Sequence, residues 1–131
     1  MTEPGFATYA LATEPNGPEG EFFEPIRRHL GAECLGVNRL ELQPRQRLRV
    51  HIHERQEELY LVLSGTLTLI VEEVEKVTAP AVVRVSPGTA RSHRNEGDEP
   101  VEIWAVSEFG HKDATKIDDF WDPSPEAKQT R

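Results

Sequence analysis

Two histidines separated by a single residue, His51 and His53, constrain this chain more than any other feature of its sequence. They end a stretch in which Leu48, Val50 and Ile52 alternate with arginine and histidine. Successive side chains of a β-strand point to opposite faces, so the pattern predicts a strand with one apolar and one polar face. Both imidazoles then point the same way, and we expect this polar face to line a cavity.

A carboxylate on the next predicted strand completes a candidate metal site. Glu58 follows the two histidines after a short connection. Two imidazole nitrogens and one carboxylate oxygen suit a divalent transition metal such as zinc, iron, manganese or nickel. Glu57 is a neighbour on the same strand and points to the opposite face, where we expect it to meet solvent or a surface arginine.

This region resembles the first sequence motif of the cupin superfamily. The motif consists of Gly, five residues, His-x-His, three or four residues, Glu, six residues and Gly. The matching residues are His51, His53, Glu58 and Gly65, with Arg45 at the position of the leading glycine. The six-residue gap before Gly65 selects Glu58, rather than the preceding glutamate, as the ligand that the resemblance implies.

A second cupin motif follows, with more departures. It consists of Gly, five residues, Pro-x-Gly, two residues, His, three residues and Asn. Gly88 and Asn95 match it, whereas Pro80, Ser86 and Arg91 stand where the family has Gly, Pro and His. Arg91 therefore occupies the place of a third histidine ligand, and a guanidinium group is always protonated and cannot bind a metal.

The sequence alone does not decide which residue, if any, replaces the third histidine ligand. His93 lies two residues after Arg91 on the same predicted strand face, and one alternative is that it replaces the missing ligand. In a second, His93 lines the cavity without touching the metal. A third is a site of two histidines and one carboxylate, with open positions for water or substrate. In a fourth, no metal binds and Arg91 pairs with Glu58.

The predicted pocket is more basic than the chain as a whole. Arg47, Arg49 and Arg91 are expected on the cavity side, with Tyr60 on the same strand face as Glu58 and with Asn95 from the second motif. Such a pocket favours a small anionic ligand, a carboxylate or a phosphate, held by paired hydrogen bonds. For Arg47 and Arg49 the alternative is a position at the outer end of the strand, in water.

Short β-like runs separated by turn residues predict an all-β fold. The cupin resemblance implies a jelly-roll β-barrel, the double-stranded β-helix, with an irregular N-terminal arm. We expect the arm at residues 1–30, the barrel at 31–115 and a tail at 116–131, with one helical turn from Pro25 to Gly31. The predicted strands cover residues 34–43, 47–53, 57–63, 66–72, 81–85, 91–95 and 101–107.

Charge and cysteine content narrow the expected binding partners and the expected cellular compartment. The chain of 131 residues carries 23 acidic residues against 15 lysines and arginines, a net charge of -8 that argues against nucleic-acid binding. It has neither an apolar run long enough for a membrane span nor a secretory signal at its start, and its single cysteine fits a reducing cytoplasm. Cupins are often dimers, so the resemblance implies a homodimer, with Phe22, Phe23, Phe120 and Trp121 as candidates for its interface.

Three functions compete on this sequence. The first is a metal-dependent enzyme that acts on a small molecule, by oxygenation or isomerisation as the resemblance implies. The second is a cupin that binds or senses a ligand without chemistry. The third is a metal-free cupin enzyme such as a sugar epimerase, with a histidine as general base and Tyr60 as its partner acid.

Overall fold

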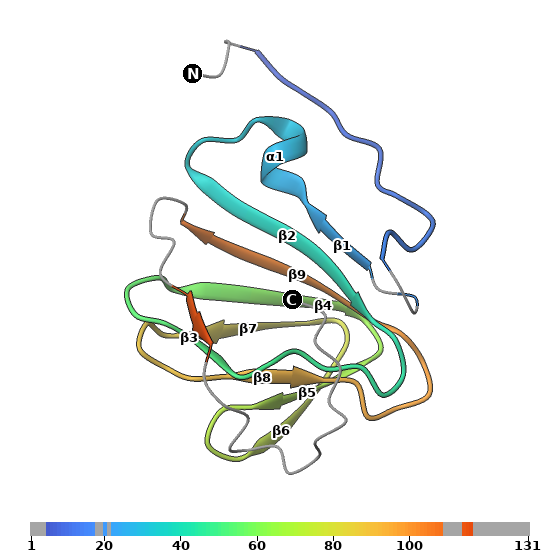
Figure 1. Ribbon diagram of the computed structural model, residues 1–131, viewed down its shortest axis with the longest axis vertical. Helices are drawn as coiled ribbons and strands as arrows, with labels where there is room; N and C mark the ends of the chain where they lie inside the picture. The colour runs from blue at the N-terminus through green and yellow to red at the C-terminus, as the bar shows by residue number, and fades with distance from the viewer. Residues whose placement is uncertain (1–4, 18–19, 21, 109–113, 117–131) are drawn as a thin grey trace.

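The computed structural model describes residues 5–17, 20, 22–108 and 114–116 of the protein. Antiparallel strands in two facing layers make up most of it, and a short helix lies beside one edge (Figure 1). The elements are β1 (Phe22–Pro25), α1 (Ile26–Leu30), β2 (Leu35–Leu42), β3 (His51–His53), β4 (Glu58–Ser64), β5 (Thr66–Ile70), β6 (Val74–Thr78), β7 (Ala81–Val85), β8 (Ser92–Arg94), β9 (Val101–Glu108) and β10 (Ala114–Lys116).

The larger layer is a five-stranded sheet in the order β1-β2-β9-β4-β7. Its central strands show the alternation expected of a sheet with one covered face. In β4, Glu58, Tyr60 and Val62 are buried on the inner face, whereas Leu59 and Leu63 are exposed on the outer face. The inner face therefore carries both core residues and candidate site residues.

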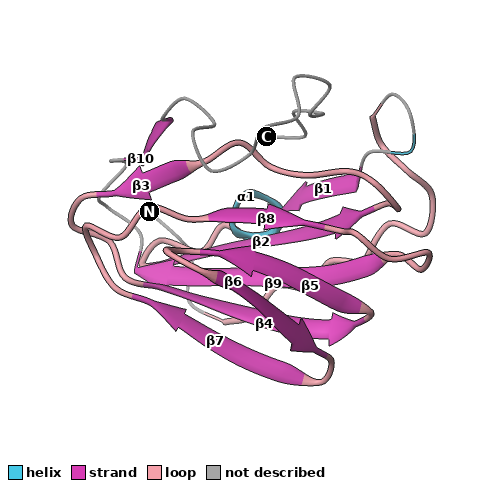
Figure 2. Cartoon of the chain, turned by 90° about the horizontal axis from the view of Figure 1, so that it is seen from below, coloured by secondary structure: helices cyan, strands magenta, loops and turns pink. Residues whose placement is uncertain are grey.

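The smaller layer contains the sheet β6-β5-β8 and the pair β10-β3 (Figure 2). Isolated bridges pair Arg47 with Arg94 and His51 with Arg91, so the chain leading into β3 runs antiparallel to β8. This places β3 beside β8, in the layer that faces β4. The two motifs of the sequence thus become neighbours in space.

The hydrophobic core fills the space between the layers. It joins β2, β4, β5 and β9, and each fully buried side chain of this kind contributes about 2 kcal/mol through the hydrophobic effect. Its most buried members are Leu42, Val62, Leu67, Val101 and Ile103. The prediction of an all-β, double-stranded β-helix fold is confirmed by this arrangement and by the structural neighbours described below.

An irregularity precedes β3 and changes which side chains face inward. Four residue steps separate Arg47 from His51, but only three separate their bridge partners Arg94 and Arg91. The extra residue acts as a β-bulge, which breaks the alternation of faces. The prediction of one regular strand over 47–53 is therefore wrong, because only His51–His53 form a strand there.

The N-terminal arm, expected to be irregular apart from one helical turn, also contains the strand β1. Phe22–Pro25 pairs with β2 and forms the edge of the five-stranded sheet. On the outer face, Glu24 accepts hydrogen bonds from Arg39 and, at 2.5 Å, from the hydroxyl of Tyr9. Arg39 also donates to Glu102 at 3.0 Å. This buried network fastens the arm to the sheet.

Local turns follow their sequence signals closely. The predicted helical turn is α1, closed by Gly31 in the left-handed conformation at φ 72°. Gly65, at φ 82°, makes the tight connection between β4 and β5. Sequence reasoning missed β6 (Val74–Thr78), because its exposed residues at the edge of the smaller sheet lack the alternation of a half-buried strand.

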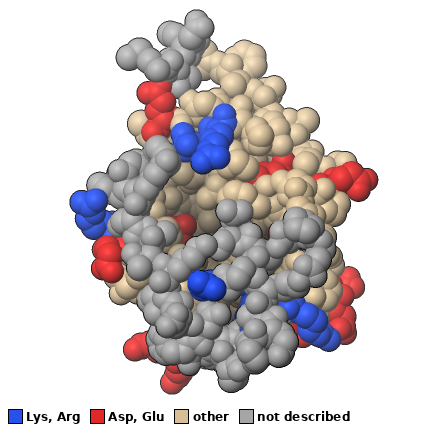
Figure 3. Space-filling model, viewed as in Figure 1, with Lys and Arg blue, Asp and Glu red and all other residues tan. Residues whose placement is uncertain are grey.

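Charged side chains are mixed over the face shown in Figure 3. Basic and acidic groups of the described residues alternate around its edge, and neither sign gathers into one continuous patch there. No helix in the described part of the chain has the length and apolar character needed to cross a membrane.

Candidate metal and ligand site

The histidines and the glutamate of the first motif converge between the two layers. His51 and His53 lie in β3, and Glu58 begins β4. Their candidate ligand atoms all lie within 4.8 Å of one another. Ligand bonds of about 2.0–2.2 Å keep the ligand atoms of one ion within about 4.4 Å of each other, so small side-chain movements complete the site. The donor set of two nitrogens and one oxygen therefore fits a divalent transition metal.

Tyr60 holds the Glu58 carboxylate toward the histidines. Its hydroxyl donates a hydrogen bond to Oε1 of Glu58, and the same oxygen lies 3.4 Å from Nε2 of His53. Burial and the adjacent carboxylate raise the pKa of Tyr60 well above its ordinary value of 10.0. The hydroxyl therefore keeps its proton and remains a donor to Glu58.

Burial favours the neutral form of two of the cavity's imidazoles, those of His51 and His93. Burial lowers the pKa of His51, and the positive charge of Arg91 acts in the same direction. Burial also lowers the pKa of His93 well below its ordinary value of 6.5, again with contributions from its neighbours His51 and Arg91. A neutral imidazole is the form that binds a metal, so these shifts favour metal binding at neutral pH.

Arg91 is a buried cation without a side-chain partner in the described part of the chain. Its backbone exchanges two hydrogen bonds with His51, at 3.0 and 2.9 Å, which puts both side chains on the same face. The residue is 0% exposed, and none of its three guanidinium nitrogens has a hydrogen-bond partner among the described residues. The alternative in which Arg91 pairs with Glu58 is therefore not what the structure contains.

His93 lies beside the trio of His51, His53 and Glu58 without joining it. Its ring centroid is 6.2 Å from that of His51 and 4.4 Å from that of Tyr60. The side chain is 1% exposed, and both of its ring nitrogens lack a hydrogen-bond partner within the described ranges. The residues brought together as ligands are two histidines and one carboxylate, and His93 faces the space next to them.

A cavity of about 270 Å³ adjoins these residues. Phe23, Leu40, Leu48 and Ala105 form apolar walls, and Asn38 adds a polar group. The volume lies below the roughly 300–1,000 Å³ typical of pockets for drug-sized ligands, so the cavity suits a small molecule. Its polar residues on the metal side are His51, His53, Glu58, Tyr60 and His93.

Two residues expected in the pocket lie elsewhere. Arg49 is exposed to solvent, because the bulge before β3 places it on a different side from His51. The side chain of Asn95 is buried but donates to the backbone oxygens of Leu42 at 3.0 Å and Glu99 at 2.7 Å. Asn95 therefore secures a turn, and Arg49 takes the alternative position in water.

Sequence reasoning missed the walls contributed by Phe23, Asn38 and Leu40. These residues come from β1 and β2, far from both motifs in the chain, and only the pairing of these strands brings them to the site. The alternation of Asn38 and Leu40 along β2 is the one local signal that they share a face. The expected position of Glu57 is confirmed, since it is exposed and pairs with Arg84.

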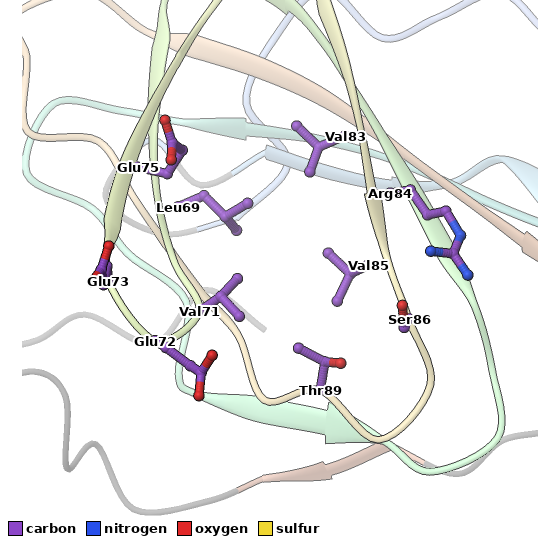
Figure 4. Close-up of a pocket in the computed structure, with 10 residues that line it drawn as sticks. All are labelled: Leu69, Val71, Glu72, Glu73, Glu75, Val83, Arg84, Val85, Ser86 and Thr89. Carbon is purple, nitrogen blue, oxygen red and sulfur yellow. The ribbon is translucent and has the colours of Figure 1, made fainter.

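A second cavity, of about 680 Å³, is larger but chemically different (Figure 4). Leu69, Val71, Val83 and Val85 point into it, while the side chain of Arg84 points away. Its lining, as far as the described residues show, contains neither histidine nor cysteine. By volume alone this larger cavity would be the candidate functional site. The smaller cavity is the better candidate, because it has converging candidate metal ligands and buried polar groups without hydrogen-bond partners.

Comparison with known proteins agrees with this geometry. The family described as Cupin domain matches residues 38–107, more than half of the chain. The match includes β3, β4 and β8, which carry His51, His53, Glu58 and His93. The chain therefore belongs to the cupin family. No curated protein matches it.

Solved structures show the same fold. A cupin protein from Bacteroides fragilis is 18% identical, with 81% of this chain and 86% of that chain covered and a TM-score of 0.69. The polyketide cyclase RemF from Streptomyces resistomycificus is 17% identical, with 81% and 76% covered and a TM-score of 0.67. At these identities the likeness concerns the fold alone.

A third structure is nearer in sequence but larger. A sugar phosphate isomerase of the cupin superfamily from Silicibacter pomeroyi is 25% identical, with a TM-score of 0.57. The alignment covers 61% of this chain and 54% of the isomerase, so about half of that protein has a counterpart here.

Proposed function

We propose that this protein is a metal-dependent cupin that binds a small anionic molecule in the barrel cavity and acts on it. The observation that carries the proposal is the convergence of His51, His53 and Glu58, whose ligand atoms lie within 4.8 Å of one another. A bound zinc, iron, manganese or nickel ion would act as a Lewis acid on an oxygen of the ligand. His93 and Tyr60 would line the remaining space.

The charges in and beside the cavity favour an anionic ligand. A divalent ion and Arg91 together carry more positive charge than the single carboxylate of Glu58 can offset, because both imidazoles are neutral ligands. Uncompensated charge in a buried site is costly, so a ligand that supplies negative charge is favoured. A phosphate is a second candidate anion, since the Silicibacter pomeroyi neighbour is described as a sugar phosphate isomerase.

A non-catalytic ligand-binding cupin is the second candidate function. Arg91 in place of the third histidine favours it, because the metal then has fewer protein ligands than the family motif supplies. A candidate ligand that raises the melting temperature and is recovered unchanged after incubation with the metal-loaded protein would support this alternative.

Metal titration of matched variants tests the proposal. Calorimetry with manganese and zinc should show one site per chain in the native protein and in Glu57→Gln, whose changed side chain is exposed. Glu58→Gln should lose most of the affinity, because a neutral amide is a poor ligand. Equal affinity of Glu57→Gln and Glu58→Gln for the metal would mean that the metal binds elsewhere or does not bind.

We also infer that the protein works as a homodimer in the cytoplasm, with its barrel at residues 31–115 between the arm, 1–30, and the tail, 116–131. Leu59, Leu63 and Val82 support the dimer, because they are exposed on the outer face of the five-stranded sheet. Of the aromatic candidates for the interface, Phe22 is buried within the chain and Phe23 lines the cavity. The other two, Phe120 and Trp121, lie outside the described residues.

A further inference from the structure

Arg91, the residue before β8, and His93 in β8 are two buried groups without hydrogen-bond partners among the described residues, and His93 lines the cavity. They are two residues apart on one strand face, with Cα atoms separated by roughly 7 Å. Both are almost fully buried, and neither side chain has a hydrogen-bond partner among the residues that the structure describes. Buried polar groups in folded proteins are nearly always satisfied, so this pair requires an explanation.

The guanidinium of Arg91 indicates which chemical group of a ligand would accept its hydrogen bonds. It offers N–H donors in a planar fork, which matches the two oxygens of a carboxylate in a bidentate arrangement. A single buried cation in a small cavity suits one carboxylate better than a phosphate, whose additional charge asks for further donors. The carboxylate that lines the cavity, that of Glu58, is already bonded to Tyr60 and close to His53.

The imidazole of His93 specifies the second group. A neutral imidazole has one N–H donor and one lone pair, so it can accept a hydrogen bond from a hydroxyl. His93 lines the cavity, and Arg91 is fully buried on the same strand face without being one of the lining residues. A ligand that satisfies both groups presents a hydroxyl next to a carboxylate. The cavity volume, about that of nine water molecules, limits the ligand to a short carbon skeleton.

We propose that the cavity takes a small 2-hydroxy acid, with its carboxylate on Arg91 and its hydroxyl between His93 and the metal side of the cavity. This inference rests on the proposed function for the position of the metal, but the contacts to Arg91 and His93 do not require the ion. Leu40, Leu48 and Phe23 then pack against the carbon skeleton. Arg91, which departs from the family motif, becomes the residue that sets specificity for an acid.

Calorimetry with three ligands of matched shape tests the assignment on the full chain, with and without manganese. Lactate is expected to bind. Lactamide lacks the charge and should bind roughly thirtyfold more weakly or worse, as expected when one partner of a buried charged pair is lost. Propionate lacks the hydroxyl and should bind about three- to tenfold more weakly, as expected for one lost hydrogen bond.

Two variants assign these differences to residues. Arg91→Gln should remove the preference for lactate over lactamide, whereas the exposed Arg49→Gln should leave it intact. In His93→Leu the affinities for lactate and propionate should become equal within about twofold. Circular dichroism of each variant verifies that it is folded, and the comparison of ligands on the native protein stands without any variant.

The outcomes separate the two proposals. Lactate binding that depends on Arg91 in a protein that takes up no metal would overturn the proposed function and sustain this inference. Metal uptake without binding of lactate, or binding of inorganic phosphate in preference to lactate, would overturn the inference and leave the metal site standing. Equal binding of lactate and lactamide by the native protein would also overturn it.

Discussion

Tyr60 orients one carboxylate of the candidate metal site through a single hydrogen bond. Its hydroxyl holds Oε1 of Glu58, so Tyr60→Phe should leave the core packed and free the carboxylate to turn. We expect the affinity for manganese to fall about 10- to 100-fold, as for other partners that orient a metal ligand. Competition with a chelating dye would measure this fall. An unchanged affinity would mean that Glu58 is held by other contacts.

The lowered pKa of His93 predicts how stability depends on pH. In the unfolded chain His93 takes up a proton as the pH falls below about 6.5, whereas in the folded protein it stays neutral to a lower pH. The unfolded state then binds more protons, so the free energy of unfolding must fall with falling pH, by at most about 1.4 kcal/mol per pH unit for this one group.

Urea unfolding of metal-free protein between pH 7 and pH 5 would measure this dependence. His93→Gln, which cannot titrate, should show a shallower decline than the native protein over the same range. Parallel curves for native protein and His93→Gln would show that another group dominates the pH dependence.

At the scale of single elements, the β4–β5 turn depends on the absence of a side chain at Gly65. A Cβ at this position would lie 2.4 Å from the backbone oxygen of Pro100. Gly88 has a similar positive φ of 77°, but a Cβ there would meet nothing within 4 Å. Gly65→Ala should therefore destabilise the protein by at least about 1 kcal/mol more than Gly88→Ala. Equal losses in urea unfolding would contradict a tight turn.

The same elements show what sequence can and cannot predict. His-x-His in a strand puts both candidate histidine ligands on one face, because strand parity is a local property, and the cupin resemblance selects Glu58 by its gap to Gly65. The bulge before β3 is not local, since it appears only when the chain is paired with β8. Strand alternation predicts Arg49 in the pocket, but the bulge interrupts this alternation and Arg49 is exposed. Arg45 has a φ of 72°, which explains a glycine at this place in the family motif.

At the scale of the whole molecule, the proposed dimer can be tested on the outer face of the five-stranded sheet. Val82 on β7 is 65% exposed on that face, and Val74 on β6 is 59% exposed in the other layer. We expect light scattering to give the mass of a dimer for native protein and for Val74→Asp, and that of a monomer for Val82→Asp, because a buried charge opposes association. The mass of a monomer for the native protein would contradict the proposed dimer.

The network that joins the arm to the sheet also acts on the whole molecule. Arg39 pairs with Glu24, which is 1% exposed, and with Glu102. Arg39→Met should cost about 3 kcal/mol of unfolding free energy, because it leaves a buried carboxylate without its cation. The double variant Arg39→Met, Glu24→Gln should recover part of the loss. Urea unfolding of both would show whether the charge, rather than the packing of Arg39 on Phe22, is responsible.

The metal content of the purified protein tests the central claim most directly. Untagged native protein, prepared without added metal, would be compared with His51→Ala by elemental mass spectrometry. We expect about one transition-metal ion per chain in the native protein and close to none in His51→Ala, because the variant lacks one of the three proposed ligands. No metal in the native protein, even after soaking with iron, zinc, manganese and nickel, would contradict it.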